Sequence, residues 1–288
     1  MNTLVTETIS ILTNAATLFV VAAGLTLVFG ALRLINMAHG SLFMIGALLV
    51  TTFAASWGGA WGFAAAVPAA SAVTALLGAG IEIAVLRRLH AREPLAQLLA
   101  TFALVLVLAD LAQRAWGSSD RSVAAPLSGG LHWSGATVPE YDLVVIGVAV
   151  LVAAGLWLLL GRTATGWRVR AAVEDPESLA AGGTNLPLLR TGVFALGAAL
   201  AGLAGAAIAP LESVGPGLDT QIIVSAFIVT VVGGLGSVAG AALGAVAIAT
   251  VESLGTLWVP SYASCAPYLV MILVLAVRPW GLFGTPER

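Results

Sequence analysis

Long apolar stretches separated by short polar breaks dominate the pattern of this chain. A helix that crosses a membrane needs about 20 mostly apolar residues. Eight stretches approach or exceed that length, at residues 9–32, 40–56, 62–86, 95–115, 141–160, 188–209, 222–259 and 262–277. The breaks between them hold glycine, proline and charged residues, which favour turns. The pattern therefore predicts an all-α bundle of membrane-spanning helices that forms a single domain over residues 1–288.

The seventh stretch, residues 222–259, decides how many times the chain crosses the membrane. Its 38 residues are nearly twice what one crossing needs. Gly233, Gly234, Gly236 and Gly240 interrupt it. It therefore forms either two short crossings joined by a tight turn or one tilted helix with a glycine-packed face. The two alternatives predict nine and eight crossings, respectively.

The composition excludes an ordinary water-soluble domain. Only 9% of the residues are charged and 59% are hydrophobic, whereas soluble domains carry about 25% charged residues. All twelve basic residues are arginine, so the chain has no phosphate-binding loop of the type that ends in Gly-Lys-Ser/Thr. One cysteine and three scattered histidines form no disulfide or metal-binding pattern. The sequence predicts no cofactor, no metal and no catalytic residue in this chain.

The distribution of arginine predicts the orientation. Cytoplasmic loops of membrane proteins are enriched in basic residues. No arginine precedes the first apolar stretch, and only Arg114 and Arg121 lie in the break after the fourth. The breaks after the first and third stretches hold Arg33, Arg87, Arg88 and Arg92, and Arg162, Arg168, Arg170 and Arg190 flank the connection between the fifth and sixth stretches. We therefore expect a periplasmic N-terminus. The C-terminal Arg278 and Arg288 favour nine crossings for the same reason.

Residues 161–187 form the longest break on the predicted cytoplasmic side. Asp175, Pro176 and Glu177 have the order of a helix N-cap, a first-turn proline and an acidic first turn. Gly182 and Gly183 follow as a C-terminal stop. The segment therefore predicts one or two short amphipathic helices with Arg168, Arg170, Glu174 and Glu177 exposed. Such a segment is either a membrane-surface helix or a docking element for a soluble partner.

Three carboxylates fall within apolar stretches, where a charge is costly. Glu82 lies about one turn from Arg87 and can reach the cytoplasmic interface. Asp110 precedes Arg114 by four residues, the spacing of a helical ion pair. Glu252 has no partner nearby in the sequence. No two of these carboxylates share a helix in the predicted bundle, which weakens a proton or sodium relay.

Small residues recur every four positions in two stretches, a pattern that lets membrane helices approach closely. The positions are Gly236, Gly240 and Gly244 in one stretch and Gly197, Ala201 and Gly205 in another. Close packing is the favoured interpretation. Broken helices around a central path are an addition to it, and they would place Gly233, Gly234, Gly236 and Ser237 along that path.

A polar break follows the first apolar stretch. It contains Asn36, His39 and Gly40. Two interpretations stay open. The break is either a cytoplasmic turn with a helix-capping asparagine and a surface histidine, or part of the lining of a solute path.

With these segments in hand, the chain resembles the permease subunit of ATP-binding-cassette importers for branched-chain amino acids, of the H type. The resemblance is collinear from about residue 24 to 284. Its blocks include GLTLVFG at 24–30, RLINMAHG at 33–40 and LAT at 99–101. They continue through 168–183, 194–205 and 226–237, and RPWGLFG at 278–284 closes the match.

The resemblance implies a bacterial inner-membrane importer with several partners. Two similar permease chains form the pore, two cytoplasmic ATPase subunits drive it, and a periplasmic binding protein delivers the solute. Lipid surrounds the pore, and no nucleic acid is involved. The resemblance also implies that the segment at 168–183 couples to the ATPase. The coupling residues are then Arg168, Arg170, Ala171, Glu174, Asp175, Pro176, Glu177, Ala180 and Gly183.

Two alternatives stay open at this point. Related permeases carry urea or short amides, and the residues of this chain show no amino-acid site. A stand-alone secondary transporter or channel is an alternative from another class, and ATP-independent uptake would distinguish it.

Overall fold

The computed structural model describes residues 2–90, 92–127, 129–133 and 136–284. The described helices are α1 (Asn2–Leu32), α2 (His39–Trp57), α3 (Gly59–Ala84), α4 (Pro94–Trp116), α5 (Glu140–Arg162), α6 (Ala164–Glu174), α7 (Pro176–Ala181), α8 (Leu186–Ile208), α9 (Leu218–Gly233), α10 (Val238–Trp258) and α11 (Ala266–Val277). Two 3₁₀ helices, η1 (Leu86–Arg88) and η2 (Pro260–Cys265), follow α3 and α10. A hairpin of β1 (Gly130–Trp133) and β2 (Ala136–Pro139) precedes α5.

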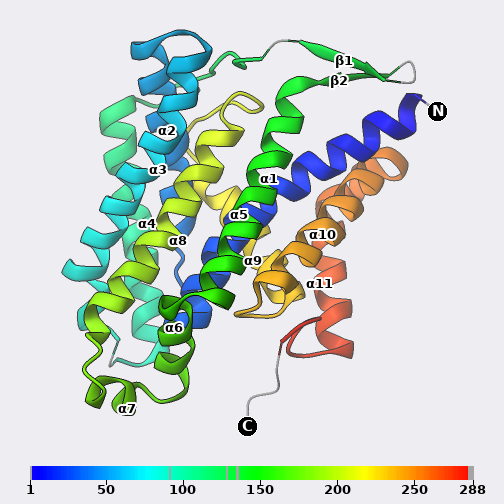
Figure 1. Cartoon of the computed structure of the whole chain (residues 1–288). Coiled ribbons are helices and arrows are strands. Elements are labelled where there is room, and N and C mark those ends of the chain that lie inside the picture. The colour runs from blue at the N-terminus through cyan, green and yellow to red at the C-terminus, as the bar shows by residue number, and fades with distance from the viewer. Residues whose placement is uncertain (1, 91, 128, 134–135, 285–288) are drawn as a thin grey trace.

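The predicted all-α membrane bundle is confirmed. Within the described ranges, eight helices are long and apolar enough to cross a membrane, and α9 is a shorter apolar helix. The hairpin was not among the predicted elements, because its four-residue strands are too short to give a clear alternating pattern. The first helix also begins at Asn2 rather than at residue 9. Its 31 residues exceed the span of a bilayer, and Figure 1 shows α1 running obliquely through the bundle.

The seventh apolar stretch is divided between α9 and α10, so the alternative of one long helix is wrong. Gly234 and Gly236 between these helices have φ angles of 105° and 86°, which residues with a Cβ rarely adopt. Ser237 then caps α10, and its Oγ accepts from the Gly240 amide at 3.0 Å. Figure 1 accordingly places the end of α11 (Ala266–Val277) at the opposite end of the bundle from the start of α1, as the alternative of two crossings predicts.

The core of the bundle lies where α8 packs against α1, α2 and α3. The apolar windows of α1, α2 and α8 are 78%, 61% and 72% buried, whereas those of α4 and α5 are 22% and 17% buried. Small residues allow this close contact. A Cβ at Gly197 of α8 would lie 3.1 Å from the Gly24 carbonyl oxygen, and one at Gly205 would lie 2.9 Å from the Phe43 carbonyl carbon. The close packing predicted for this face of α8 is confirmed.

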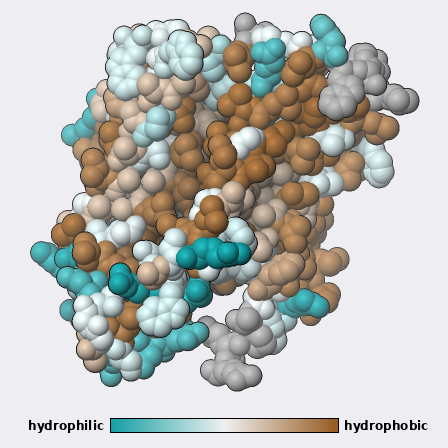
Figure 2. All heavy atoms as spheres, viewed as in Figure 1, coloured by the Kyte–Doolittle hydropathy of each residue, from teal (hydrophilic) through white to brown (hydrophobic). Residues whose placement is uncertain are grey.

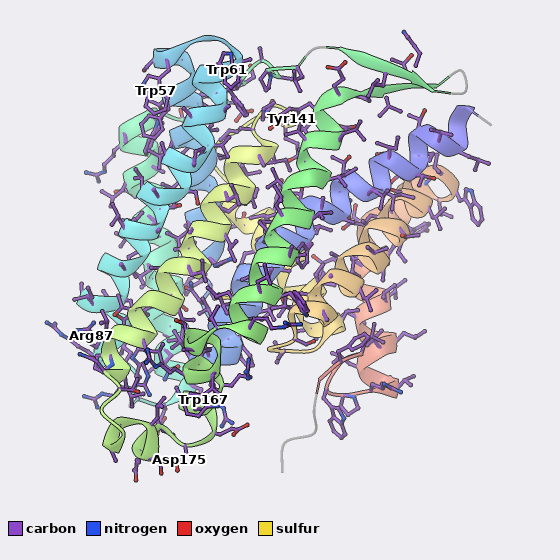
Figure 3. The ribbon with its side chains drawn as sticks, viewed as in Figure 1. Trp57, Trp61, Arg87, Tyr141, Trp167 and Asp175 are labelled. Atoms are coloured by element: carbon purple, nitrogen blue, oxygen red, sulfur yellow. The ribbon has the colours of Figure 1, made fainter. Side chains whose placement is uncertain are left out.

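The two ends of the bundle differ in chemistry. Figure 1 shows the β1–β2 hairpin and the N-terminus at one end and α6–α7 at the other, and Figure 2 shows hydrophilic residues gathered around α6–α7 below a hydrophobic middle. Trp57, Trp61 and Tyr141 lie toward the hairpin end, and Arg87, Trp167 and Asp175 toward the other (Figure 3). At the hairpin end, Arg114 lies in the last turn of α4 and Arg121 lies in the segment that follows α4. The remaining described arginines flank helix ends on the α6–α7 side, which we call the arginine-rich end, and Arg288 lies outside the described residues.

Candidate functional site

The segment at 161–187 forms two capped helices that protrude from the arginine-rich end. Thr163 caps α6, because its hydroxyl accepts from the Gly166 amide at 3.2 Å. Asp175 caps α7 and accepts from the Ser178 amide at 3.0 Å, with Pro176 in the first turn. Gly183 ends the pair with a φ of 82°. The predicted start and stop signals of α7 are therefore confirmed.

The predicted coupling residues lie mostly on the free surface of this pair. Arg168, Arg170, Glu174, Asp175, Glu177, Ala180 and Gly183 are exposed, and Ala171 and Pro176 are half-buried. Val169 and Leu179 turn inward and are buried. Trp167, which the sequence analysis did not single out, is 61% exposed. The surface therefore combines charges with one large aromatic side chain, a composition that suits contact with a protein.

The electrostatics of this surface favour a fixed negative charge at the tip. Hydrogen bonds from the Ser178 hydroxyl and amide to Asp175 hold the pKa of that carboxyl below its ordinary value. The guanidinium of Arg170 donates to the Leu160 carbonyl, which ties α6 to the end of α5. Asp175 is thus ionised at neutral pH, and it stands at the turn between the two helices, where Figure 3 shows it at the extremity of the molecule.

A buried hydrogen-bonded cluster connects this region to the core. Glu82 of α3 is fully buried, although the sequence placed it only near the interface. The Thr191 hydroxyl of α8 donates to Glu82 Oε2 at 2.6 Å. Arg87 Nη2 lies 3.4 Å from the same oxygen and donates to Thr191 Oγ1 at 2.8 Å. Since α8 begins five residues after α7 ends, the cluster anchors the helix that follows the protruding pair.

The polar break after α1 is packed inside the protein. His39 and Asn36 are fully buried, so the interpretation of a surface histidine is wrong. His39 Nε2 lies 3.1 Å from the Val21 carbonyl oxygen, which can only accept, so this nitrogen carries the proton. The Asn36 side chain accepts from the Ala38 amide at 3.1 Å, as a turn-forming asparagine does. The break therefore joins α1 to α2 inside the bundle.

The N-terminus of α2 meets the N-terminus of α9 within the bundle. Gly40 allows the approach, since a Cβ there would lie 2.9 Å from the Ile223 side chain. Ser41 donates to the buried carboxylate of Asp219 at 3.2 Å, and the Thr220 amide donates to it at 2.9 Å. Two helix N-termini carry partial positive charge and stabilise this buried anion.

The glycine-rich turn between α9 and α10 is covered by the C-terminal segment. The Leu282 and Phe283 amides donate to the Val232 and Gly233 carbonyls at 2.9 and 3.0 Å. A Cβ at Gly236 would lie 3.3 Å from Gly30 Cα. Gly233, Gly234, Gly236 and Ser237 therefore hold a close contact between α1, α9 and the C-terminal segment, and their place along a solute path stays a prediction.

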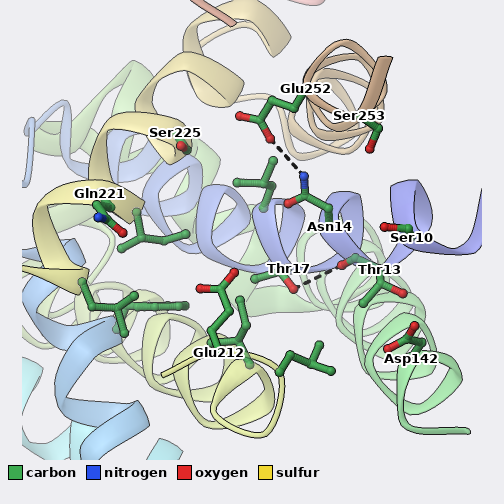
Figure 4. Close-up of a pocket in the computed structure, with 16 residues that line it drawn as sticks. Ser10, Thr13, Asn14, Thr17, Asp142, Glu212, Gln221, Ser225, Glu252 and Ser253 are labelled. Atoms are coloured by element: carbon green, nitrogen blue, oxygen red, sulfur yellow. Dashed lines mark hydrogen bonds between the residues drawn. The ribbon is translucent and has the colours of Figure 1, made fainter. Parts of the chain in front are cut away.

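A polar cavity of about 510 Å³ lies between α1, α5, the segment after α8, α9 and α10 (Figure 4). Its polar lining consists of Ser10, Thr13, Asn14, Thr17, Asp142, Glu212, Gln221, Ser225, Glu252 and Ser253. Asn14 donates to Glu252 at 2.9 Å, which supplies the partner that the sequence did not show. Neither His39 nor Asn36 lines this cavity. The size falls in the range of small-molecule sites.

A second cavity of about 550 Å³ lies where α6 and the segment after α7 meet α1, α5 and α8. Leucines from α1, α5 and α8 form one wall, and Arg168 and the turn at 182–185 form the other. The protruding pair is therefore not packed tightly onto the bundle along its whole length. It contacts the bundle through α5 and α1 on the side of α6 and, less extensively, through α8.

Comparison with known proteins agrees with this architecture. The family described as "Branched-chain amino acid transport system / permease component" matches residues 8–275. The chain is 29% identical to the high-affinity branched-chain amino acid transport system permease protein BraD of Pseudomonas aeruginosa, over 96% of this chain and 94% of BraD. It is 28% identical to the corresponding LivH protein of Escherichia coli, with the same coverage of both chains.

A more distant similarity covers only part of the chain. The fructose import permease protein FrcC of Rhizobium meliloti is 31% identical over 51% of this chain and 42% of FrcC. No solved structure matches the chain. The permease components of such importers are not catalytic, since the ATPase is a separate subunit. The family matches most of the length of this chain, and the bundle has the apolar helices that a permease needs. This chain therefore belongs to the permease components of branched-chain amino acid transport systems.

Proposed function

We propose that this permease component forms the path by which a branched-chain amino acid enters a bacterial cell, driven by ATP hydrolysis on a separate cytoplasmic subunit. The observation that carries the proposal is the helix pair α6–α7. It is closed by its own caps, exposed on its polar face and located at the arginine-rich end of the bundle. A permease that is driven by ATP needs an exposed surface that contacts its ATPase, and an ATP-independent transporter does not.

The orientation follows from the charge distribution. Basic residues are retained on the cytoplasmic side of bacterial membranes, and the arginine-rich end holds most of the described arginines. We therefore assign this end, with α6–α7, to the cytoplasm of the inner membrane. The N-terminus and the β1–β2 hairpin then face the periplasm, where a binding protein delivers the solute.

The coupling mechanism uses α8 as the connection. Two ATPase subunits close on ATP and push the α6–α7 pair of each permease chain. The turn at 182–185 passes the movement to α8, whose first turns are held to α3 by Thr191 and Glu82. Because α8 packs against α1, α2 and α3, these helices move as one body. Two similar permease chains, moving in this way, open the path between them alternately to either side.

The proposed function also includes the identity of the solute. The family and the full-length relatives BraD and LivH support a branched-chain amino acid. Urea or a short amide is the alternative solute. Uptake of labelled leucine, isoleucine and valine against urea and acetamide, in vesicles that contain the complete importer, separates the two.

The coupling role is tested by reversing the charges at the tip of α6–α7. In the double variant Glu174→Arg with Asp175→Arg, we expect the ATPase to be lost from the purified permease, because both carboxylates are exposed and available to a basic partner surface. The measurements are co-purification of the ATPase and solute-stimulated ATP hydrolysis in reconstituted vesicles.

Two controls isolate the charge effect. Asp175→Asn keeps an acceptor for the Ser178 amide and so preserves the cap. Glu93→Arg reverses an exposed charge at the same end of the bundle, outside α6–α7. Glu93→Arg should retain the ATPase in full, and Asp175→Asn, which removes one charge without reversing it, should retain more of the ATPase than the double variant. If the double variant also keeps its ATPase and full coupled uptake, α6–α7 is not the coupling element.

A further inference from the structure

The polar cavity between α1, α5, α9 and α10 is lined by acidic side chains without a basic partner. Asp142, Glu212 and Glu252 contribute carboxylates to its lining, and no arginine is among the described lining residues. The chain has no lysine that could supply a positive charge instead. Three acidic groups around one space in a membrane protein favour an occupant that carries positive charge.

A buried hydroxyl provides a second, independent observation. Thr13 is only 8% exposed, lines the cavity, and its Oγ1 has no hydrogen-bond partner within the described part of the chain. Buried polar groups are nearly always paired. Figure 4 shows Thr13 on the side of α1 that faces Asp142, and the Asn14–Glu252 pair on the other side of the same helix. The Thr13 hydroxyl oxygen is therefore free to accept a hydrogen bond from a molecule bound in the cavity.

The spacing of the carboxylates decides between a metal ion and an organic cation. Within the described residues, no group of three or more histidine, cysteine, aspartate or glutamate side chains is close enough to hold a metal ion. A divalent ion needs several oxygens at 2.0–2.6 Å. An ammonium group is satisfied by a looser arrangement of acceptors, because it offers three separate donors.

We propose that this cavity is a solute subsite that binds the ammonium group of a small primary amine. The carboxyl groups of Asp142, Glu212 and Glu252 make the lining acidic and attract the ammonium group, and Thr13, on the side of α1 that faces Asp142, accepts one of its hydrogens. The apolar remainder of the solute contacts Leu18, Phe43 and Ile222, which also line the cavity. The proposal rests on the proposed function for its solute, and it adds that the permease itself recognises the amino end of that solute.

The test measures occupancy of the cavity directly, without transport. Single cysteines replace Ser225 and, in a second variant, Ser253, in a Cys265→Ser background of the full chain in its own membranes. Both serines line the cavity. The rate of reaction with a small maleimide is measured with increasing isopentylamine, isopentanol or isovalerate. We expect isopentylamine to slow the reaction, and the alcohol and the acid to have little effect.

The acidic residues are then tested by isosteric changes. Glu252→Gln and Glu212→Gln should each raise the isopentylamine concentration for half-protection by about tenfold, because each removes one acidic group from the lining. Asp110→Asn is the matched control, because it removes an exposed carboxylate that pairs with Arg114 outside this cavity. Ser118→Cys, in the loop after α4, reports any general effect of the amine on the reaction.

Each outcome bears on the proposal. Equal protection by the amine, the alcohol and the acid would show an apolar site and overturn it, as would full protection in both glutamine variants. A lack of reaction at both cysteines without any amine would mean that another chain fills the cavity, and this too would overturn it. Protection by isopentylamine together with absent amino-acid uptake would leave the subsite standing and refute the proposed function instead.

Discussion

Replacing Thr191 by valine tests whether the α3–α8 cluster stabilises the bundle. The two side chains have the same shape, so the change removes a hydroxyl without creating a large cavity. In the native protein this hydroxyl donates to the fully buried Glu82 carboxylate at 2.6 Å. After the change, Glu82 keeps only Arg87, at 3.4 Å, among the partners found in the described residues.

The magnitude follows from that geometry. A hydrogen bond to a charged group contributes about 1.5–3 kcal/mol to stability. Arg87 is 40% exposed and lies farther away, so it compensates only in part. We therefore expect a loss of about 2 kcal/mol in the free energy of unfolding. By the relation for soluble domains of comparable length, this lowers Tm by about 4–8 °C.

The assay is thermal unfolding of the purified permease in detergent, with two companion variants. Thr191→Ser keeps the hydroxyl and should recover most of the lost stability. Thr250→Val is the matched control, because its hydroxyl donates only to the Val246 carbonyl of its own helix. It should change stability by less than about 0.5 kcal/mol. Equal Tm values for Thr191→Val and Thr250→Val would refute the reasoning.

Two further predictions concern helix packing and orientation. Gly240→Leu should abolish assembly, because a Cβ at this position would already lie 2.8 Å from the Gly233 carbonyl carbon. Gly80→Leu should express normally, since no atom of a neighbouring segment lies within 4 Å of a Cβ there. The yield and the gel-filtration profile of the purified protein check both expectations. A cysteine at Ser178 in a Cys265→Ser background should react with an impermeant maleimide only in inside-out vesicles, and reaction in intact cells would reverse the assigned orientation.

Local signals allowed the α6–α7 pair to be predicted closely. The cap at Asp175, the proline at 176 and the glycines at 182 and 183 act within a few residues of one another, so the sequence alone contains the determinants of α7. The same holds for the pair Asp110–Arg114, whose side chains lie 2.8 Å apart on one helix face. The exposed Trp167 was missed because a tryptophan near a membrane has no single preferred role.

Features that depend on distant residues could not be predicted. The polar cavity combines polar side chains from five segments, and only Glu252, without a sequence neighbour to pair with, hinted at it. Its partner Asn14 lies 238 residues away. The burial of His39 likewise depends on the segment after α1 entering the bundle, where the Val21 carbonyl is available. Hydropathy patterns contain no information about such contacts.

The positions of the helix pair and the polar cavity support a specific role for α8 in the proposed coupling. Its first turn follows α7, and its last residue, Ile208, lines the polar cavity together with Leu211 and Glu212 just beyond it. A helix of 23 residues is about 35 Å long, so α8 spans the distance from one end of the bundle toward the other. Because α8 is held to α1, α2 and α3, a displacement of α6–α7 cannot be absorbed by bending α8 alone.

The helices α9 and α10 also line the polar cavity. They join the rest of the bundle mainly through α1 and α2, and α10 is less buried than α8. Glu212 follows the end of α8, Gln221 lies on α9, and Glu252 lies on α10, where Asn14 of α1 donates to it at 2.9 Å. In the proposed mechanism, a push on α6–α7 therefore reaches the acidic groups of the cavity through α8 and α1. Movement driven by ATP would then alter the affinity for a cationic group in the cavity, which is the coupling that a pump requires.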